Sequence, residues 1–118
     1  MTHDPRPLAA TYFRAWQAKD FGALRSVLAD DVTFRGPLGT ADGADACLRG
    51  LQGMAQIMTD IVIRRVFADD SDVLTWFDLH TTLAPACATA NWSHIENGKI
   101  AAIRVTFDAR ELAAAMGR

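Results

Sequence analysis

Residues 28–39 read LADDVTFRGPLG and follow two short segments in which apolar residues recur at helical spacing. The adjacent pair Asp30-Asp31 favours a turn, because short polar side chains hydrogen-bond the neighbouring backbone. Val32–Arg35 then predicts a short strand. Gly36, directly before Pro37, contributes no side chain where this strand ends. A strand placed among helices indicates a domain that mixes α and β structure.

Three helices are predicted around this strand. Asp4-Pro5 is typical of an N-cap followed by a first helical residue, and Asp20 can cap a second, short helix. Asp42, directly before Gly43, can cap the third helix. The apolar residues that give each helix a buried face are Leu8, Tyr12, Phe13 and Trp16 in the first, Phe21, Leu24, Val27 and Leu28 in the second, and Cys47, Leu51, Met54 and Met58 in the third.

The third helix contains two glycines, Gly50 and Gly53. A glycine inside a helix costs about 1 kcal/mol relative to alanine, so the pair requires an explanation. We interpret it as a place where another backbone segment approaches the helix closely.

From Asp60 onward apolar and polar residues alternate, which is typical of half-buried strands. The alternation predicts four antiparallel strands, over Ile61–Phe67, Val73–Leu83, Ala86–Ile95 and Lys99–Asp108. Turn residues separate the strands, and a last helix is predicted over Ala109–Met116. The predicted order is helix, helix, strand, helix and four strands.

Turn lengths decide which side chains of these strands share a face, because a shift of one residue moves every side chain to the other face. A two-residue turn at Ala84-Pro85 pairs Asp78 with Asn91 and His80 with Thr89. A four-residue turn over 69–72 pairs Arg65 with Trp76 and Ile63 with Asp78.

The last hairpin has two alternatives. A three-residue loop over Glu96–Gly98 pairs Asn91 with Ile103, so that Val105 and Phe107 share its face. A two-residue Asn-Gly turn puts Arg104 on that face instead.

Two faces of the strand Val73–Leu83 compete for the interior. The first carries Val73, Thr75, Phe77 and Leu79, and hydrophobicity alone favours burying it. The second carries Leu74, Trp76, Asp78 and His80.

Composition excludes several classes of protein. The 118 residues fit one domain over 1–118, and a net charge of −2 without a basic cluster argues against nucleic acid and anionic membranes as partners. The N-terminus lacks a basic segment followed by an apolar core, and no apolar run approaches the ~18 residues of a membrane span. We therefore expect a soluble cytoplasmic protein. Cys47 and Cys87 have no ligand-like spacing, so we expect small buried residues and neither metal nor cofactor.

The stretch 28–39 resembles the matching stretch of ketosteroid isomerases and of SnoaL-like polyketide cyclases, which share the nuclear-transport-factor-2-like cone fold. The predicted order of elements is also similar to that fold, in which a curled mixed or antiparallel sheet wraps the N-terminal helices and leaves a pocket. Residues 98–108, GKIAAIRVTFD, resemble the last strand of the limonene epoxide hydrolase branch. The resemblance spans nearly the whole chain and implies an α+β cone.

The resemblance also implies candidate catalytic residues. Tyr12 matches the isomerase tyrosine that donates a hydrogen bond to the developing oxyanion. Asn91 falls where isomerases and SnoaL-like cyclases have their pocket Asp, but an amide exchanges no proton. Asp78, in the segment TWFDL at 75–79, matches the epoxide hydrolase acid.

Each branch also has catalytic positions that are replaced here. Gly36 stands where the isomerases have the Asp that shuttles a proton. Trp76 and Val105 stand where the epoxide hydrolases have an Arg and a second acid.

The resemblance favours the face with Asp78 and His80 as the pocket wall, where desolvation would raise the proton affinity of the carboxyl and His80 could act as a base. It implies a cofactor-free acid/base enzyme of the isomerase, cyclase or hydrolase type, acting on a hydrophobic polyketide-, steroid- or terpenoid-like substrate. The alternative is a non-catalytic protein of the same fold that binds a small hydrophobic ligand, or a dimerising scaffold.

The expected pocket is apolar and rich in aromatic residues and methionine, which suits a flat hydrophobic ligand. Besides Tyr12, Asp78 and Asn91, it is predicted to contain Trp16, Phe34, Leu38, Met54, Met58, Trp76, Val105 and Phe107. We also expect a homodimer built through the opposite face of the sheet, because that face mixes a large aromatic residue with small ones. It is predicted to carry Ala88, Ala90, Trp92, His94, Arg104 and Thr106.

Overall fold

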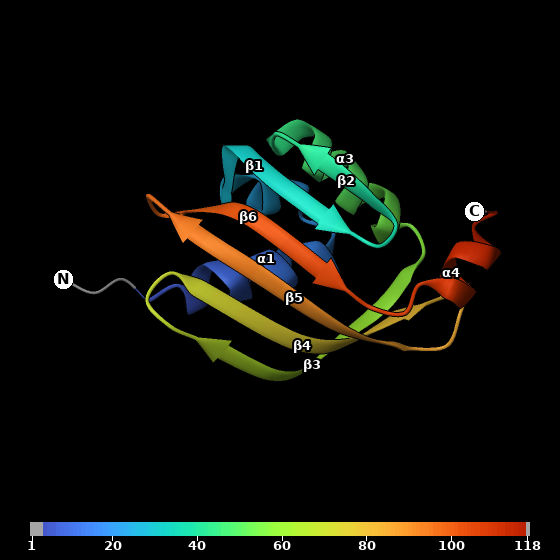
Figure 1. Cartoon of the computed structure of the whole chain (residues 1–118). Coiled ribbons are helices and arrows are strands. Elements are labelled where there is room, and N and C mark those ends of the chain that lie inside the picture. Colours follow the sequence, from blue (N-terminus) through green and yellow to red (C-terminus); the bar gives the residue numbers. More distant parts are fainter. Residues whose placement is uncertain (1–3, 118) are drawn as a thin grey trace.

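The protein is a curved sheet that wraps around helices, as seen in a computed structural model that describes residues 4–117 (Figure 1). Its helices are α1 (Arg6–Ala18), α2 (Phe21–Ser26), α3 (Ala44–Ala55) and α4 (Arg110–Ala115). Its strands are β1 (Leu28–Gly36), β2 (Gly39–Asp42), β3 (Met58–Ala68), β4 (Asp72–Thr81), β5 (Cys87–Glu96) and β6 (Lys99–Thr106). The α+β class and the cone architecture are confirmed. Of the predicted domain 1–118, residues 1–3 and 118 lie outside the described part.

The strands form one sheet in the order β2-β1-β6-β5-β4-β3. β1 runs parallel to β6, and the other neighbouring pairs are antiparallel, as predicted for β3 to β6. No helix among residues 4–117 is both long and apolar enough to cross a membrane.

The stretch 28–39 forms more strand than its composition indicates. Asp30 and Asp31 lie within β1 and not in a turn, and Asp30 forms an ion pair with Arg25 at 2.7 Å. The pairing of β1 with β6 shifts register between Leu28 and Thr33, which accommodates the two exposed aspartates. β2, which the sequence did not predict, pairs with β1 through a tight hairpin after Gly36.

The helix caps are partly as predicted. The Asp20 side chain accepts a hydrogen bond from the backbone N–H of Ala23, which confirms it as the cap of α2. Asp42 does not cap α3, because it ends β2 and pairs with Arg35 at 2.8 Å. Gly43 occupies that position with a φ of 91°, which favours a residue without a side chain.

The register between β4 and β5 differs from the prediction. Asp78 pairs with Ala88 and Asn91 pairs with Thr75, because residues 82–86 form a longer connection than the two-residue turn expected at Ala84-Pro85. The displacement is an odd number of residues, so Asp78 and Asn91 lie on opposite faces of the sheet.

The register between β5 and β6 combines both alternatives. Glu96 pairs with Lys99, which makes Asn97-Gly98 a two-residue turn with both residues at positive φ. The pairing then shifts by one residue between His94 and Ile95, so Asn91 lies opposite Val105. Val105 therefore shares the face of Asn91, as the three-residue loop predicted.

The register between β3 and β4 is partly as predicted. Arg65 lies opposite Trp76. Ile63 pairs with Phe77 instead of Asp78, because the pairing shifts between Ile63 and Arg65.

The hydrophobic face of β4 is the buried one. Val73, Thr75, Phe77 and Leu79 point toward the helices, and the Phe77 ring meets the Phe13 ring of α1 with centroids 5.0 Å apart. The prediction that Trp76, Asp78 and His80 face the interior is wrong. Alternating burial of apolar side chains decided the parity of this strand, as the composition of the two faces alone indicated.

Candidate functional site

A cavity of about 420 Å³ lies between the sheet and the helices α1 and α3. The hairpin between β1 and β2 and Met116, which follows α4, complete its wall. The lining residues are mostly apolar: Tyr12, Trp16, Phe34, Gly36, Pro37, Leu38, Gly39, Thr40, Ala41, Ala46, Cys47, Gly50, Leu51, Gly53, Met54, Phe77, Leu79, Thr89, Asn91, Val105, Phe107 and Met116.

The cavity has a deep end and a mouth. The deep end is defined by Tyr12, Phe77, Thr89 and Asn91, whose exposed fractions are 1%, 2%, 1% and 2%. The mouth is defined by lining residues that are solvent-exposed, namely Pro37, Gly39, Thr40, Gly50 and Gly53. The exposed part of the lining is therefore contributed by α3 and by the β1–β2 hairpin.

Two polar side chains of the deep end retain hydrogen-bonding capacity. The Asn91 amide donates from Nδ2 to Ser93 Oγ at 3.1 Å, and its Oδ1 accepts no hydrogen bond from residues 4–117. The Tyr12 hydroxyl likewise has no hydrogen-bond partner among residues 4–117. Every fully buried side-chain nitrogen or oxygen atom of these residues does have a partner, so the Tyr12 hydroxyl oxygen is not fully buried. Both groups therefore open on to the cavity, where a ligand can reach them.

Two other polar side chains of the wall already donate hydrogen bonds to the backbone. Trp16 Nε1 donates to the carbonyl oxygen of Leu51 at 2.9 Å, which fixes the indole of α1 against α3. Thr89 Oγ1 donates to the carbonyl oxygen of Cys87 at 3.0 Å. These bonds hold the wall in place and leave Tyr12 and Asn91 as its available polar contacts at the deep end.

The cavity carries no formal charge at neutral pH. Burial raises the pKa of the Tyr12 phenol well above its usual value, and the nearby Cys47 adds to the shift. Burial also raises the pKa of the Cys47 thiol to about 11. No Asp, Glu, His, Lys or Arg is among the lining residues found within residues 4–117. The site is a neutral apolar chamber with a hydroxyl and an amide at its deep end.

Asp78, predicted as the acid of the site, lies on the opposite side of the sheet. Its carboxylate accepts two hydrogen bonds from the Arg64 guanidinium, the shorter at 2.7 Å. His80 and Trp76 share this outer face because they share the parity of Asp78. None of the three lines the cavity.

The other predicted site residues line the cavity, with one exception. Met58 is buried in the core at the start of β3 but does not line the cavity. Tyr12, Asn91, Trp16, Phe34, Leu38, Met54, Val105 and Phe107 do line it, and their roles toward a ligand stay predictions. Sequence reasoning missed Phe77, Leu79 and Thr89, although the apolar alternation of β4 already indicated the first two.

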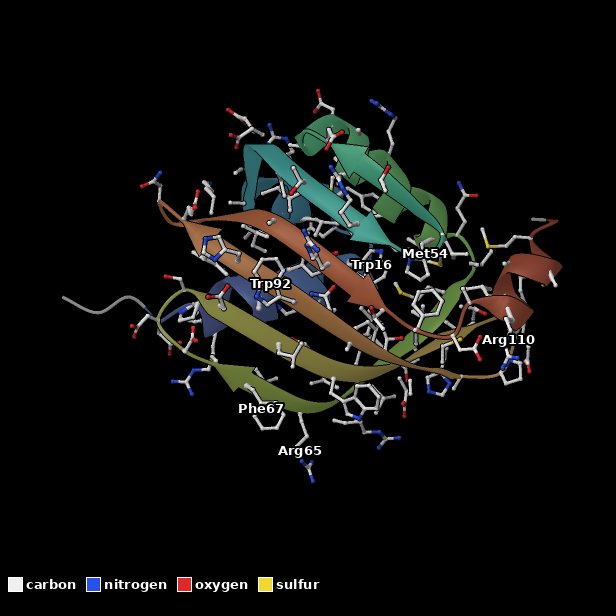
Figure 2. The ribbon with its side chains drawn as sticks, in the orientation of Figure 1. Trp16, Met54, Arg65, Phe67, Trp92 and Arg110 are labelled. Carbon is white, nitrogen blue, oxygen red and sulfur yellow. The ribbon has the colours of Figure 1, made fainter. Side chains whose placement is uncertain are left out.

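The outer face carries the polar cluster of the sheet. His94 Nδ1 lies 2.8 Å from Asp72 and its Nε2 lies 3.1 Å from Glu96, while the Trp92 ring stacks on the imidazole. Trp92 lies over the face turned away from α1 (Figure 2). Within residues 4–117, no group of three or more His, Cys, Asp and Glu residues is placed to hold a metal ion.

Comparison with known proteins identifies the family to which the chain belongs. The profile of the SnoaL-like domain matches residues 9–115. The chain belongs to the SnoaL-like domain family. A comparison of the sequence with curated proteins gives no significant match.

Solved structures share the fold of this SnoaL-like domain. An NTF2-like protein of unknown function from Cytophaga hutchinsonii has a TM-score of 0.84 at 25% identity, over 95% of this chain and 96% of that one. A steroid delta-isomerase from Pseudomonas aeruginosa has a TM-score of 0.81 at 20% identity, over 97% and 89%. An LEH-like epoxide hydrolase of M. tuberculosis has a TM-score of 0.78 at 20% identity, over 99% and 92%. The SnoaL-like assignment and the NTF2-like fold predicted from the sequence are confirmed.

Proposed function

We propose that this SnoaL-like domain binds a small, neutral and largely apolar molecule, and that it holds one oxygen atom of that molecule at the deep end of the cavity. The observation that carries the proposal is the pair of hydrogen-bonding groups at the deep end, Tyr12 and Asn91, that keep an unpartnered atom among residues 4–117, in a mostly apolar and uncharged wall. Steroid-, polyketide- and terpenoid-like ketones have this chemistry.

The physical argument has two parts. Apolar surface moved from water to this wall contributes about 25 cal/mol per Å², so the aromatic lining supplies the affinity. A charged ligand would lose its hydration here without meeting an opposite charge, so the wall selects neutral molecules. A ligand without an oxygen would leave Tyr12 and Asn91 unpaired, which costs affinity and gives specificity.

The position of Asp78 favours binding over acid/base catalysis. A general base must come within hydrogen-bond reach of the proton that it removes, and this carboxylate lies on the outer face in an ion pair with Arg64. The titratable groups of the wall, Tyr12 and Cys47, stay protonated at neutral pH. These observations support the ligand-binding alternative of the sequence-based prediction.

Titration calorimetry with 2-acetylnaphthalene, a neutral aryl ketone, tests the proposal. We expect the ketone to bind, 2-ethylnaphthalene to bind about tenfold more weakly, and the anion 2-naphthoate not to bind. Asn91→Leu should weaken ketone binding by a similar factor. Asp78→Asn is the matched control on the outer face and should leave the affinity unchanged. Equal binding of ketone and naphthoate, or loss of binding in Asp78→Asn, would contradict the proposal.

We also propose that the outer face joins two copies of the chain. Phe67, Leu74 and Trp76 are exposed to 61%, 42% and 42%, and the register places Phe67 beside Leu74 and Leu74 beside Trp92. An apolar band of this kind is typical of protein contacts, and charges of both signs, such as Arg65 and Asp72, lie around it and can complement a second copy.

Light scattering tests this assembly. Wild type is expected to scatter as a dimer at micromolar concentration, and Leu74→Asp as a monomer. A monomeric wild type would rule the assembly out.

A further inference from the structure

The two glycines of α3 face open space within the described residues 4–117. A Cβ atom built on Gly50 or on Gly53 would meet no heavy atom of these residues within 4 Å other than those of its chain neighbours and its own helix, so the close backbone approach expected from the sequence is wrong. Their φ angles are not in the left-handed region either, so no backbone strain requires glycine. Glycine inside a helix is nevertheless destabilising relative to alanine. The protein thus carries a helix defect that its own contacts do not explain.

Both glycines line the cavity. Ala46, Gly50 and Gly53 are spaced by four and three residues and so lie along one face of α3, beside the stripe that carries Met54. At Gly39, across the mouth on the β1–β2 hairpin, a Cβ atom would likewise meet no heavy atom within 4 Å among residues 4–117 beyond its chain neighbours. The mouth is therefore kept open by the absence of side chains on both of its sides.

The polar groups of the deep end determine how a ligand would be oriented relative to this mouth. Tyr12 and Asn91 are 1% and 2% exposed, both face the cavity, and each keeps a hydrogen-bonding atom without a partner among residues 4–117. A ligand whose oxygen meets these atoms must extend its remaining atoms toward the mouth, because the deep end is closed by buried side chains.

We propose that Gly50 and Gly53 determine the specificity of the pocket for elongated ligands. The bare backbone of α3 between Ala46 and Met54 forms a slot that accepts the apolar tail or the far ring of a molecule whose oxygen lies at Tyr12 and Asn91. The ligand class is a neutral ketone or alcohol with an apolar extension opposite its oxygen. This inference rests on the proposed ligand-binding function.

A pair of ketones with the same head separates the slot from the rest of the pocket. Calorimetry would compare 4-methylacetophenone with 4-hexylacetophenone, which adds length only at the end opposite the carbonyl. In the wild type we expect the hexyl compound to bind at least about tenfold more tightly. Gly53→Leu and Gly50→Leu should remove this advantage while leaving 4-methylacetophenone within about twofold of its wild-type affinity. Gly22→Leu, an exposed glycine on α2 that does not line the cavity, is the matched control and should behave as wild type.

The outcomes are distinct. If 4-hexylacetophenone keeps its advantage in both leucine variants, the slot does not contact the ligand and the inference is wrong. If neither ketone binds the wild type, the proposed function itself fails. A leucine variant that loses both ketones would show that α3 blocks the whole cavity and not a separate slot.

Alanine variants provide a second, independent readout. Gly50→Ala and Gly53→Ala should raise the Tm of the free protein, because alanine favours the helix and meets no neighbour. A fall in Tm would mean that glycine is required by the fold, which overturns a ligand-directed role.

Discussion

The two faces of β4 and β5 are built from alternating residues of the same strands, yet their chemistry differs sharply. The inner face buries Phe77 and Leu79 beside the neutral amide of Asn91. The outer face holds Asp78 in an ion pair with Arg64, and His94 between two carboxylates. The carboxylate and imidazole side chains of these two strands thus lie outside the cavity, and the neutral amide of Asn91 lies within it. Strand parity, more than residue type, decides which of them a ligand can meet.

The largest difference between the faces should appear in stability. Phe77→Ala removes a ring that is 2% exposed and contacts Phe13, so it should lower the free energy of unfolding by about 3–5 kcal/mol. Trp76→Ala, the adjacent outer residue, should cost less than about 1 kcal/mol in the monomer. Urea denaturation at a concentration below that of self-association measures both. Equal losses would contradict the assigned parity.

A carboxyl moved to the inner face should behave differently from the natural outer one. Asn91→Asp places an acid in the apolar cavity, where desolvation raises its folded pKa above the unfolded value near 4. Such a group is neutral in both states at low pH, so stability is retained there and falls as pH rises through the folded pKa. We expect a loss of about 2–3 kcal/mol between pH 4 and pH 8 relative to wild type. Thr106→Asp, on the exposed outer face, should show no comparable loss in the same denaturation series.

The ion pair between Arg64 and Asp78 on the outer face should contribute little to the free energy of unfolding. Arg64 and Asp78 have side chains exposed to 55% and 23%, so solvent screens their attraction. Asp78→Asn should therefore lower the free energy of unfolding by less than about 1 kcal/mol, with a further decrease of the effect in high salt. A larger, salt-independent loss in urea titrations would place Asp78 in a drier environment than the outer face provides.

The smallest expected effect is the pH dependence contributed by His94. The hydrogen bond to Asp72 is the main cause that raises the pKa of His94, with Glu96 adding to it. A raised folded pKa means that this contribution is complete below the unfolded value of about 6.5 and is lost as pH rises through the folded pKa. Unfolding curves of the wild type should show a small decline in stability above pH 6.5 that His94→Gln lacks and that Asp72→Asn reduces, because Glu96 remains beside the imidazole. A decline that persists unchanged in both variants would assign it to another group.

Apart from β2, the order of elements and the faces of most helices could be predicted from the sequence, because helical spacing and alternation record burial directly. The pocket walls contributed by α1, β1 and β6 were predicted for the same reason, as Tyr12, Phe34 and Val105 illustrate. The face of the candidate acid Asp78 was predicted wrongly, because the family resemblance favoured the face opposite to the one that the apolar alternation of β4 indicates. Its pairing with Asn91 was wrong because it depended on the length of the connection at Ala84-Pro85. Composition does not fix whether such a loop has two residues or more.

Irregular strand pairing was the second reason why the register of the sheet was not fully predicted. The shifts between Ile63 and Arg65 and between His94 and Ile95 each displace one strand by a residue, and no local residue pattern announced them. The glycines of α3 show a third limit. Their cost was visible in the sequence, but whether they face a backbone, solvent or a cavity could be decided only in three dimensions.

The register shift between β5 and β6, at which Ala101 is the unpaired extra residue, also bears on how such a pocket can change during evolution. Without this shift, the two-residue Asn97-Gly98 turn would align Arg104 with Asn91, and a guanidinium would replace the isopropyl group of Val105 in the cavity wall. Deleting Ala101 would leave Asn91 opposite Val105, whereas a single-codon deletion in β5 between Asn91 and Ile95, with the shift kept, would place Arg104 opposite Asn91 and convert a neutral chamber into a cationic one without any substitution. In this scaffold, short insertions and deletions at irregular strand pairings can change which class of ligand the pocket binds. A comparison of aligned sequences position by position would not detect such a change.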